Sequence, residues 1–122
     1  MNSLHIDIAQ ELIACAKNKT TICYSDLCNK VGYPSQRTIG RELEKVSLLT
    51  YDKCGIFLSV LVVEKETQGS DNPIPGAGFF TMYVDVCGKP DRPMEDVVRE
   101  QRENAFEQDW STLIEDIQSK IK

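Results

Sequence analysis

Residues 21–46 read TICYSDLCNKVGYPSQRTIGRELEKV, and this stretch decides the predicted fold. Ser25 is a favourable N-cap for one helix, and Gly32 is typical of a helix end. Ser35 is the expected cap of a second helix, after a tight turn at Pro34. Apolar residues repeat at helical spacing on both sides of the turn, at Leu27, Cys28 and Val31 and then at Ile39, Leu43 and Val46. The stretch therefore predicts two helices joined by a tight turn, as in a helix-turn-helix.

The segment before this stretch predicts a helix and a short strand. An apolar repeat at helical spacing indicates a helix that ends near Asn18. The apolar residues of this repeat are Leu4, Ile8, Leu12 and Cys15. Residues 20–23 are β-prone. A helix and a short strand that lead into two further helices match the first elements of a winged-helix domain.

Two later segments favour strands. IFLSVLVV at residues 56–63 and FFTMYVDV at residues 79–86 are rich in β-branched and aromatic residues. Between them, residues 64–78 carry Gly and Pro in turn combinations. The two strands are therefore expected to pair as a hairpin that forms the wing. The expected fold class is α+β, a winged helix-turn-helix of three helices and a β-hairpin in residues 1–90.

The C-terminal part, residues 91–122, predicts an added helix that packs on this domain or on a partner. Pro93 suits the first turn of a helix, which is expected to run to about Lys120. The broad apolar stripe of this helix includes Phe106 and Trp110, which are the candidate partner-binding residues. Nine acidic residues accompany five basic ones in this part, so a basic partner protein would fit its surface.

The composition is that of a globular protein without a metal or cofactor site. The 122 residues carry a formal net charge of −5 and contain five Cys and one His. The cysteines form no CxxC pair, the single histidine His5 is expected to be exposed, and no P-loop is present, so we expect neither a metal nor a cofactor. No apolar run approaches the roughly 20 residues that span a bilayer, and the N-terminus lacks a basic start, so a cytoplasmic location is expected.

The charge is unevenly distributed along the chain. Residues 1–50 hold six basic and five acidic residues, so a weakly basic face is expected only in this half. Gln36 and Arg37, at the expected start of the second helix of the stretch, are placed to read bases. Lys65 is expected at the tip of the wing, near the phosphate backbone. The candidate residues for binding double-stranded DNA are Tyr24, Ser35, Gln36, Arg37, Arg41, Lys45 and Lys65.

Residues 24–46 resemble the DNA-binding part of the DNA alkyltransferases and the alkyltransferase-like proteins. Those proteins have a tyrosine just before the first of two helices and an arginine at the start of the recognition helix, with Val-Gly or a similar pair two residues on. The matching residues here are Tyr24 and the run Arg37-Thr38-Ile39-Gly40. The resemblance, over about a third of the chain, implies that Tyr24 helps to rotate a nucleotide out of the duplex and that Arg37 takes its place in the stack.

The reactive motif of that family is missing. Its Pro-Cys-His-Arg-Val sequence corresponds here to Leu58-Ser59-Val60-Leu61-Val62. Ser59 stands in place of the nucleophilic cysteine and Val60 in place of the histidine that activates it, so alkyl transfer has no chemical route. The chain is therefore expected not to be an enzyme. Residues 58–80 are also similar to small uncharacterised bacterial proteins, a resemblance that implies no biochemical role.

The candidate residues have structural alternatives. Tyr24 could be a half-buried aromatic at a strand–helix junction. Arg37 and Arg41 could form a solvated helix face. Cys54, beside a lysine, could be an activated thiol or a structural one. The PGAG sequence at residues 75–78 could cradle a phosphate, but a tight turn is the simpler interpretation.

Two functions of different classes therefore remain open. The first is a small non-enzymatic protein that binds double-stranded DNA with its third helix in a groove. The second is a protein-interaction module, or a subunit of a larger bacterial or phage system, that binds its partner through the C-terminal helix. The placement of Tyr24 and Arg37 favours the first function, whereas the low net basicity favours the second.

Overall fold

Residues 21–46 form the two helices that their sequence predicts. The computed structural model describes residues 1–121. In it, α2 spans Tyr24–Val31 and α3 spans Ile39–Cys54. α2 ends at Gly32, whose φ of 72° lies in the left-handed region that glycine adopts without strain. The prediction of two helices joined by a turn is therefore confirmed.

The second of these helices begins later than expected. The backbone N–H groups of Thr38 and Ile39 donate to the carbonyl of Ser35 at 3.4 and 3.2 Å, which forms a turn before the helix. Thr38 is the N-cap of α3, and the Ser35 side chain does not cap it. Arg37 therefore lies in the turn that leads into α3 rather than on the first turn of that helix.

The predicted winged helix is wrong. The two strands of residues 1–121, β1 (Ile22–Cys23) and β2 (Val62–Val63), pair in parallel, with Ile22 opposite Val62. A wing would be an antiparallel hairpin of two consecutive strands, and none occurs in the described part of the chain. Lys65, predicted at the tip of a wing, lies instead in the short 3-10 helix η2 (Lys65–Thr67).

Residues 56–63 form the 3-10 helix η1 (Leu58–Leu61) followed by β2, not one long strand. Side chains from the neighbouring helices accept hydrogen bonds from three successive backbone N–H groups of this segment. The pairs are Phe57 with Gln101 at 2.8 Å, Leu58 with Thr50 at 3.2 Å and Ser59 with Ser47 at 2.7 Å. Because these donors are already paired, they are not free to form a strand ladder. A short apolar run alone does not distinguish the two outcomes.

Residues 79–86, the second predicted strand, belong to helix α4 (Ala77–Cys87). The composition favoured a strand, but the spacing of the apolar residues is helical. Phe79, Met82, Tyr83 and Val86 stand at positions i, i+3, i+4 and i+7. Phe79 and Met82 are buried, so the spacing of the buried residues prevailed over local β-propensity.

The C-terminal part forms two helices where one was predicted. α5 spans Met94–Glu107 and α6 spans Leu113–Gln118. The chain between them leaves the helical conformation at Gln108, whose φ and ψ are −72° and 142°. Trp110 lies in this connection and is buried, with its indole N–H donating to the carbonyl of Ala105 at 2.9 Å.

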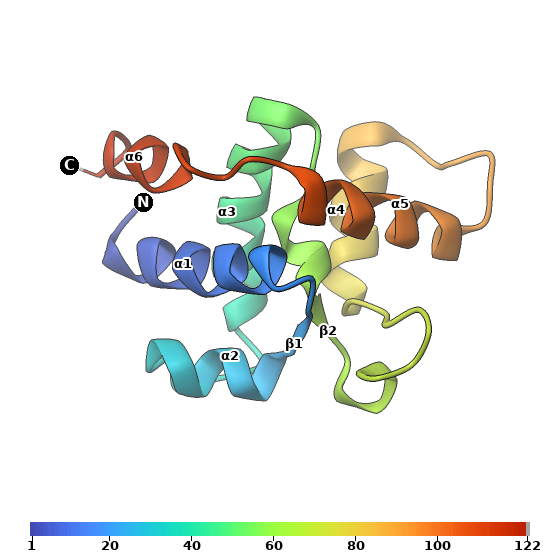
Figure 1. Ribbon diagram of the computed structural model, residues 1–122, viewed down its shortest axis with the longest axis horizontal. Helices are drawn as coiled ribbons and strands as arrows, with labels where there is room; N and C mark the ends of the chain where they lie inside the picture. The colour runs from blue at the N-terminus through green and yellow to red at the C-terminus, as the bar shows by residue number, and fades with distance from the viewer. Residues whose placement is uncertain (122) are drawn as a thin grey trace.

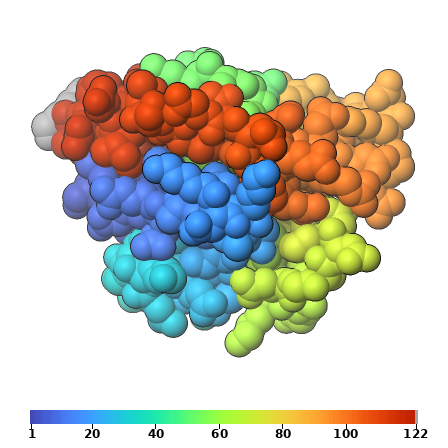
Figure 2. Space-filling model, in the orientation of Figure 1, coloured from blue at the N-terminus to red at the C-terminus, as the bar shows by residue number. Residues whose placement is uncertain are grey.

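The buried segment 56–63 runs through the centre of the molecule, with helices around it (Figure 1). The first helix, α1 (Ser3–Lys17), packs against α2, α3, α5, α6 and η1. In Figure 2, α1 (blue), α2 (light blue to cyan) and α5 and α6 (orange to red) cover much of the face shown, while the loop at residues 64–75 (yellow-green) protrudes at one edge. No helix in residues 1–121 is both long and apolar enough to cross a membrane.

Candidate functional site

A cleft of about 510 Å³ lies where the first turns of α3 and α4 face η1. Its apolar lining comes from Leu43, Phe79 and Met82. Small residues, Gly40 on α3 and the Gly76-Ala77-Gly78 run at the start of α4, form much of the rest. The polar lining residues are Tyr24, Gln36, Arg37, Arg41, Glu44, Ser59 and Glu64. The volume falls within the range of ligand sites, roughly 300–1,000 Å³.

Four of the predicted DNA-binding residues line this cleft, and three of them, Gln36, Arg37 and Arg41, come from the start of α3 or the turn before it. Gln36 and Arg37 come from the turn before α3, and Arg41 lies in its first turn. All three side chains are exposed. Within residues 1–121, neither arginine forms an ion pair or a side-chain hydrogen bond. Both guanidinium groups are therefore available to a ligand.

Two carboxylates offset this positive charge. Glu44 on α3 and Glu64 after β2 also line the cleft, and both are exposed. Two arginines and two glutamates leave the lining with no formal net charge. The cleft is therefore polar at its rim but is not a strongly basic surface of the kind that binds phosphates alone.

Tyr24 is a half-buried aromatic residue at the junction of β1 and α2, as its structural interpretation predicts. Cys23, not Ser25, is the N-cap of α2, which makes Tyr24 the first helical residue. Its Oη accepts a hydrogen bond from the N–H of Gly76 at 3.0 Å, and burial raises the pKa of its phenol. A Cβ atom on Gly76 would lie 2.6 Å from that Oη. Tyr24 thus fixes the start of α4 at one wall of the cleft.

Ser59 lies at the inner side of the cleft, on η1. Its residue is buried, and its Oγ has no hydrogen-bond partner within residues 1–121. The adjacent Val60 is fully buried, and no histidine or cysteine of the described chain lines the cleft. The site therefore offers a hydroxyl without a neighbouring base to activate it.

Sequence reasoning missed the residues that hold Ser59 in place. Ser47 and Thr50 lie on the buried side of α3, and Gln101 is buried on α5. Gln101 also donates from Nε2 to the carbonyl of Gly55 at 3.2 Å. These polar residues occupy helix positions that are otherwise apolar. Such a pattern in the sequence can reveal them, because a buried polar side chain needs a hydrogen-bond partner.

The other predicted site residues lie outside the lining of this cleft. Lys45 pairs with Glu42 at 3.2 Å, and Ser35 is half-buried in the turn before α3. Of the two candidate partner-binding residues, Phe106 is half-buried against the core and Trp110 is buried. The indole of Trp110 therefore contacts the chain itself.

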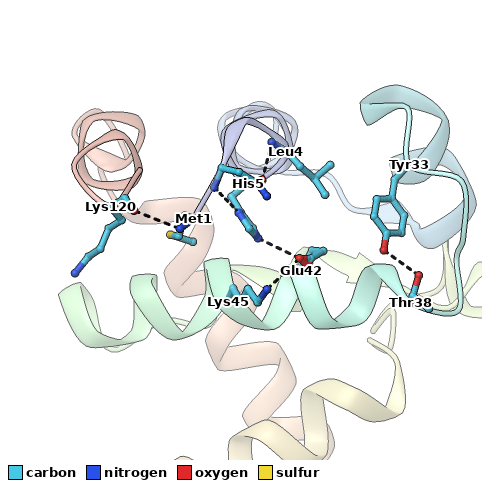
Figure 3. Close-up of polar contacts among 9 residues, drawn as sticks. Met1, Leu4, His5, Tyr33, Thr38, Glu42, Lys45 and Lys120 are labelled. Carbon is cyan, nitrogen blue, oxygen red and sulfur yellow. Dashed lines mark hydrogen bonds and ion pairs between the residues drawn. The ribbon is translucent and has the colours of Figure 1, made fainter. Parts of the chain in front are cut away.

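His5 is buried, which corrects the expectation that it is exposed. Its Nδ1 accepts from the N–H of Asn2 at 2.9 Å, and its Nε2 lies 3.4 Å from Oε1 of Glu42 on α3 (Figure 3). Burial lowers the pKa of His5, although the nearby Glu42 carboxylate acts in the opposite direction. The imidazole therefore completes the cap of α1, while its buried Nε2 faces Glu42 of α3 without a hydrogen bond.

Burial or a hydrogen bond gives three of the cysteines, Cys23, Cys28 and Cys54, a structural role. All five are free thiols, and Cys23 and Cys28 are buried. The thiol of Cys54 donates to the carbonyl of Thr50 at 3.3 Å, and burial raises its pKa. A raised pKa lowers the thiolate fraction, so these contacts favour the structural interpretation of Cys54.

Comparison of the chain with protein-family models, with curated proteins and with solved structures finds no match in any of the three.

Proposed function

We propose that this protein binds nucleic acid without catalysing a reaction, with the start of α3 at a groove and one unpaired or extruded base in the cleft. The observation that carries the proposal is the pair of unpaired arginines, Arg37 and Arg41, at the rim of a cleft with an apolar lining. A guanidinium group can stack on bases and can hydrogen-bond to base edges or phosphates.

The lining suits a planar ring. Leu43, Phe79 and Met82 are buried and make the inner wall apolar, and Gly40 and Gly78 leave room for a ring to approach the backbone. Proteins that take a base out of the stack hold it by contacts of this kind, together with hydrogen bonds to its polar edge. The cleft also has the volume for such a ligand.

The resemblance to the alkyltransferase-like proteins adds support. Arg37, the residue matched to the intercalating arginine, and Ser59, the residue matched to the reactive cysteine, line the same cleft although they are far apart in sequence. Tyr24, the third matched residue, lines it too. No residue that could act as a general base lies beside Ser59. We therefore propose binding without catalysis.

The alternative, a protein-interaction module that uses residues 91–122, has less support. Its apolar stripe depended on Phe106 and Trp110, but Trp110 is buried within the chain. The charged residues that this part exposes are mostly acidic and include Glu95, Glu103 and Glu107. Under this alternative, the partner would be a basic protein that binds the acidic surface.

Duplex-binding titrations test the proposal. A fluorescent duplex with one central mismatch is titrated with wild type and with Arg37→Ala at roughly 50 and 200 mM salt, because phosphate contacts strengthen as salt falls. We expect wild type to bind at the lower salt and to bind more weakly at the higher one. Arg37→Ala should weaken binding by about 5-fold or more, the effect of losing one arginine contact.

Lys120→Ala is the matched control, since it removes the same charge from an exposed residue outside the cleft. Its affinity should equal that of wild type. Absence of wild-type binding at the lower salt would reject the proposal, and equal losses in Arg37→Ala and Lys120→Ala would reject the assignment to this cleft.

A further inference from the structure

Charged side chains of both signs line the cleft without pairing to each other. They are Arg37, Arg41, Glu44 and Glu64. Within residues 1–121, none of the four forms an ion pair or a side-chain hydrogen bond, and all four are exposed. The cleft therefore presents separate donors and acceptors, and a ligand with groups of both kinds can use them.

The two carboxylates carry information about the ligand. A cleft that met only phosphates would not gain from them, because they repel negative charge. An ionised carboxylate is a hydrogen-bond acceptor only, so its complement is a donor on the ligand. A nucleotide within a strand has two kinds of donor, which are the N–H groups of its base and, in a ribonucleotide alone, the 2′-hydroxyl.

Glu64 is the carboxylate that does not share an element with the arginines. Glu44 lies on α3, whereas Glu64 follows β2. The backbone of Glu64 is fixed, because its N–H donates to the carbonyl of Ile74 at 2.7 Å and its carbonyl accepts from the N–H of Thr67 at 3.0 Å. Burial is the main cause of the raised pKa of the Tyr24 phenol, and the negative charge of Glu64 adds to it. The carboxylate therefore lies near the wall that Tyr24 forms.

The depth of the lining residues indicates which part of a nucleotide Glu64 meets. Leu43, Phe79 and Met82 are buried at the inner wall, whereas the side chain of Glu64 is exposed. A base that enters the cleft packs its ring against the inner wall, while its sugar stays joined to the strand outside. The sugar therefore lies at the mouth of the cleft, at the level of the exposed side chains.

We propose that the Glu64 carboxylate accepts a hydrogen bond from the 2′-hydroxyl of the nucleotide in the cleft, so that the protein selects a ribonucleotide over a deoxyribonucleotide. This inference rests on the proposed function, because it names the class of nucleotide that the same cleft takes. Glu64 is a specificity-determining residue and takes part in no covalent step. A site that hydrogen-bonds a ligand hydroxyl disfavours the analogue without it, because its polar group then loses water and gains no partner.

The test uses three fluorescent DNA duplexes of one sequence with one central mismatched nucleotide. They differ only at the 2′ position of that nucleotide, which carries hydrogen, hydroxyl or O-methyl, and the O-methyl group cannot donate a hydrogen bond. We expect wild type to bind the hydroxyl form about 5- to 10-fold more tightly than the other two, the effect of one hydrogen bond. Glu64→Ala should bind all three forms with the same affinity.

Glu66→Ala is the matched control. It removes the same charge two residues along the chain, from an exposed side chain that does not line the cleft. It should keep the preference of wild type for the hydroxyl form. The urea midpoints of both variants should equal that of wild type, because neither side chain forms an ion pair or a hydrogen bond within residues 1–121.

The outcomes separate this inference from the function on which it rests. If wild type binds none of the three duplexes, both proposals fail. If wild type binds the hydrogen and hydroxyl forms equally well, the preference for a ribonucleotide is rejected while nucleic-acid binding stands. A preference that survives in Glu64→Ala, or one that is lost in Glu66→Ala as well, would reject the assignment to Glu64. If Glu64→Ala changes the preference among mismatched bases and not the preference at the 2′ position, the carboxylate meets the base and the inference is overturned.

Discussion

At the scale of single residues, buried polar side chains decide the conformation of the segment that reaches the cleft. Gln101 bonds both Phe57 N–H and Gly55 C=O. We expect Gln101→Ala to lower the free energy of unfolding by about 1–3 kcal/mol, because it leaves these backbone groups unpaired. Urea denaturation measures the change, with Gln118→Ala on the exposed side of α6 as the control that should stay within about 0.5 kcal/mol of wild type.

The contact between Gly76 and Tyr24 has a sharper test. Gly76→Ala would place a Cβ atom 2.6 Å from Tyr24 Oη, so we expect a loss of about 1–3 kcal/mol from overpacking. Gly78→Ala, two residues along α4, meets no atom within 4 Å and should be neutral or stabilising. Thermal unfolding compares the two variants. Removal of the hydroxyl by Tyr24→Phe should rescue part of the loss in Gly76→Ala, and equal stability of the two alanine variants would contradict the contact.

His5 should make stability depend on pH near neutrality. Its folded-state pKa lies below the ordinary value of 6.5, first because of burial and also because Lys45 and the N-terminal ammonium lie near, while Glu42 opposes the shift. The unfolded chain therefore binds the proton more readily than the folded one. Stability should be full above pH 6.5 and should fall as pH decreases from 6.5 toward the folded-state pKa.

Urea midpoints between pH 7.5 and 5.5, roughly the range around an ordinary histidine pKa, measure this effect. His5→Gln is the matched variant, since glutamine retains an acceptor for the helix cap but does not titrate. Its midpoint should vary less over this range than that of wild type. The same slope in both proteins would show that another group is responsible.

At the scale of elements, the sequence predicted the helices where spacing and end signals agreed. Residues 21–46 gave two helices in the right order because apolar spacing, turn residues and Gly32 all indicated the same structure. Residues 79–86 form a helix although their aromatic and β-branched composition favours a strand, because the buried residues Phe79 and Met82 stand at helical spacing. Residues 56–63 could not be assigned from local sequence, since their N–H partners come from α3 and from Gln101 on α5.

The candidate cleft was partly visible in the sequence. Tyr24, Gln36, Arg37 and Arg41 were singled out, and all four line it. The sequence does not place Glu64, Phe79 or Met82 at this cleft, because the predicted wing puts residues 64–86 elsewhere. Gly76, Ala77 and Gly78, from the run considered as a phosphate cradle, do line it. Which distant segments meet at a cleft depends on the packing of α3, η1 and α4, and no local pattern encodes it.

The helical state of α4 can be tested by one substitution. Thr81 is exposed on α4, where alanine has the higher helix propensity. Thr81→Ala should therefore raise the free energy of unfolding by about 0.5 kcal/mol, because the difference in helix propensity exceeds the value of a weak exposed hydrogen bond. In a strand the same change would lower stability, by up to about 1 kcal/mol. Chemical denaturation distinguishes the two signs.

At the scale of the whole molecule, the cleft and the surface of α5 and α6 differ in charge. The formal net charge is −5, yet the acidic excess belongs mainly to residues 91–122, and the cleft lining is neutral with its arginines unpaired. A nucleic acid should therefore approach through the cleft and avoid α5 and α6, because like charges repel there. A basic partner protein should do the opposite, so the position of the contact identifies the class of ligand.

The most direct test of the account is a map of backbone amide NMR shifts as a short mismatched duplex is added to the protein. We expect the shifts to concentrate at the cleft, in the turn before α3 and its first turns, at Ser59, and in Gly76 to Phe79 at the start of α4. Shifts confined to α5 and α6, or no shifts at low salt, would contradict the central claim that this cleft meets nucleic acid.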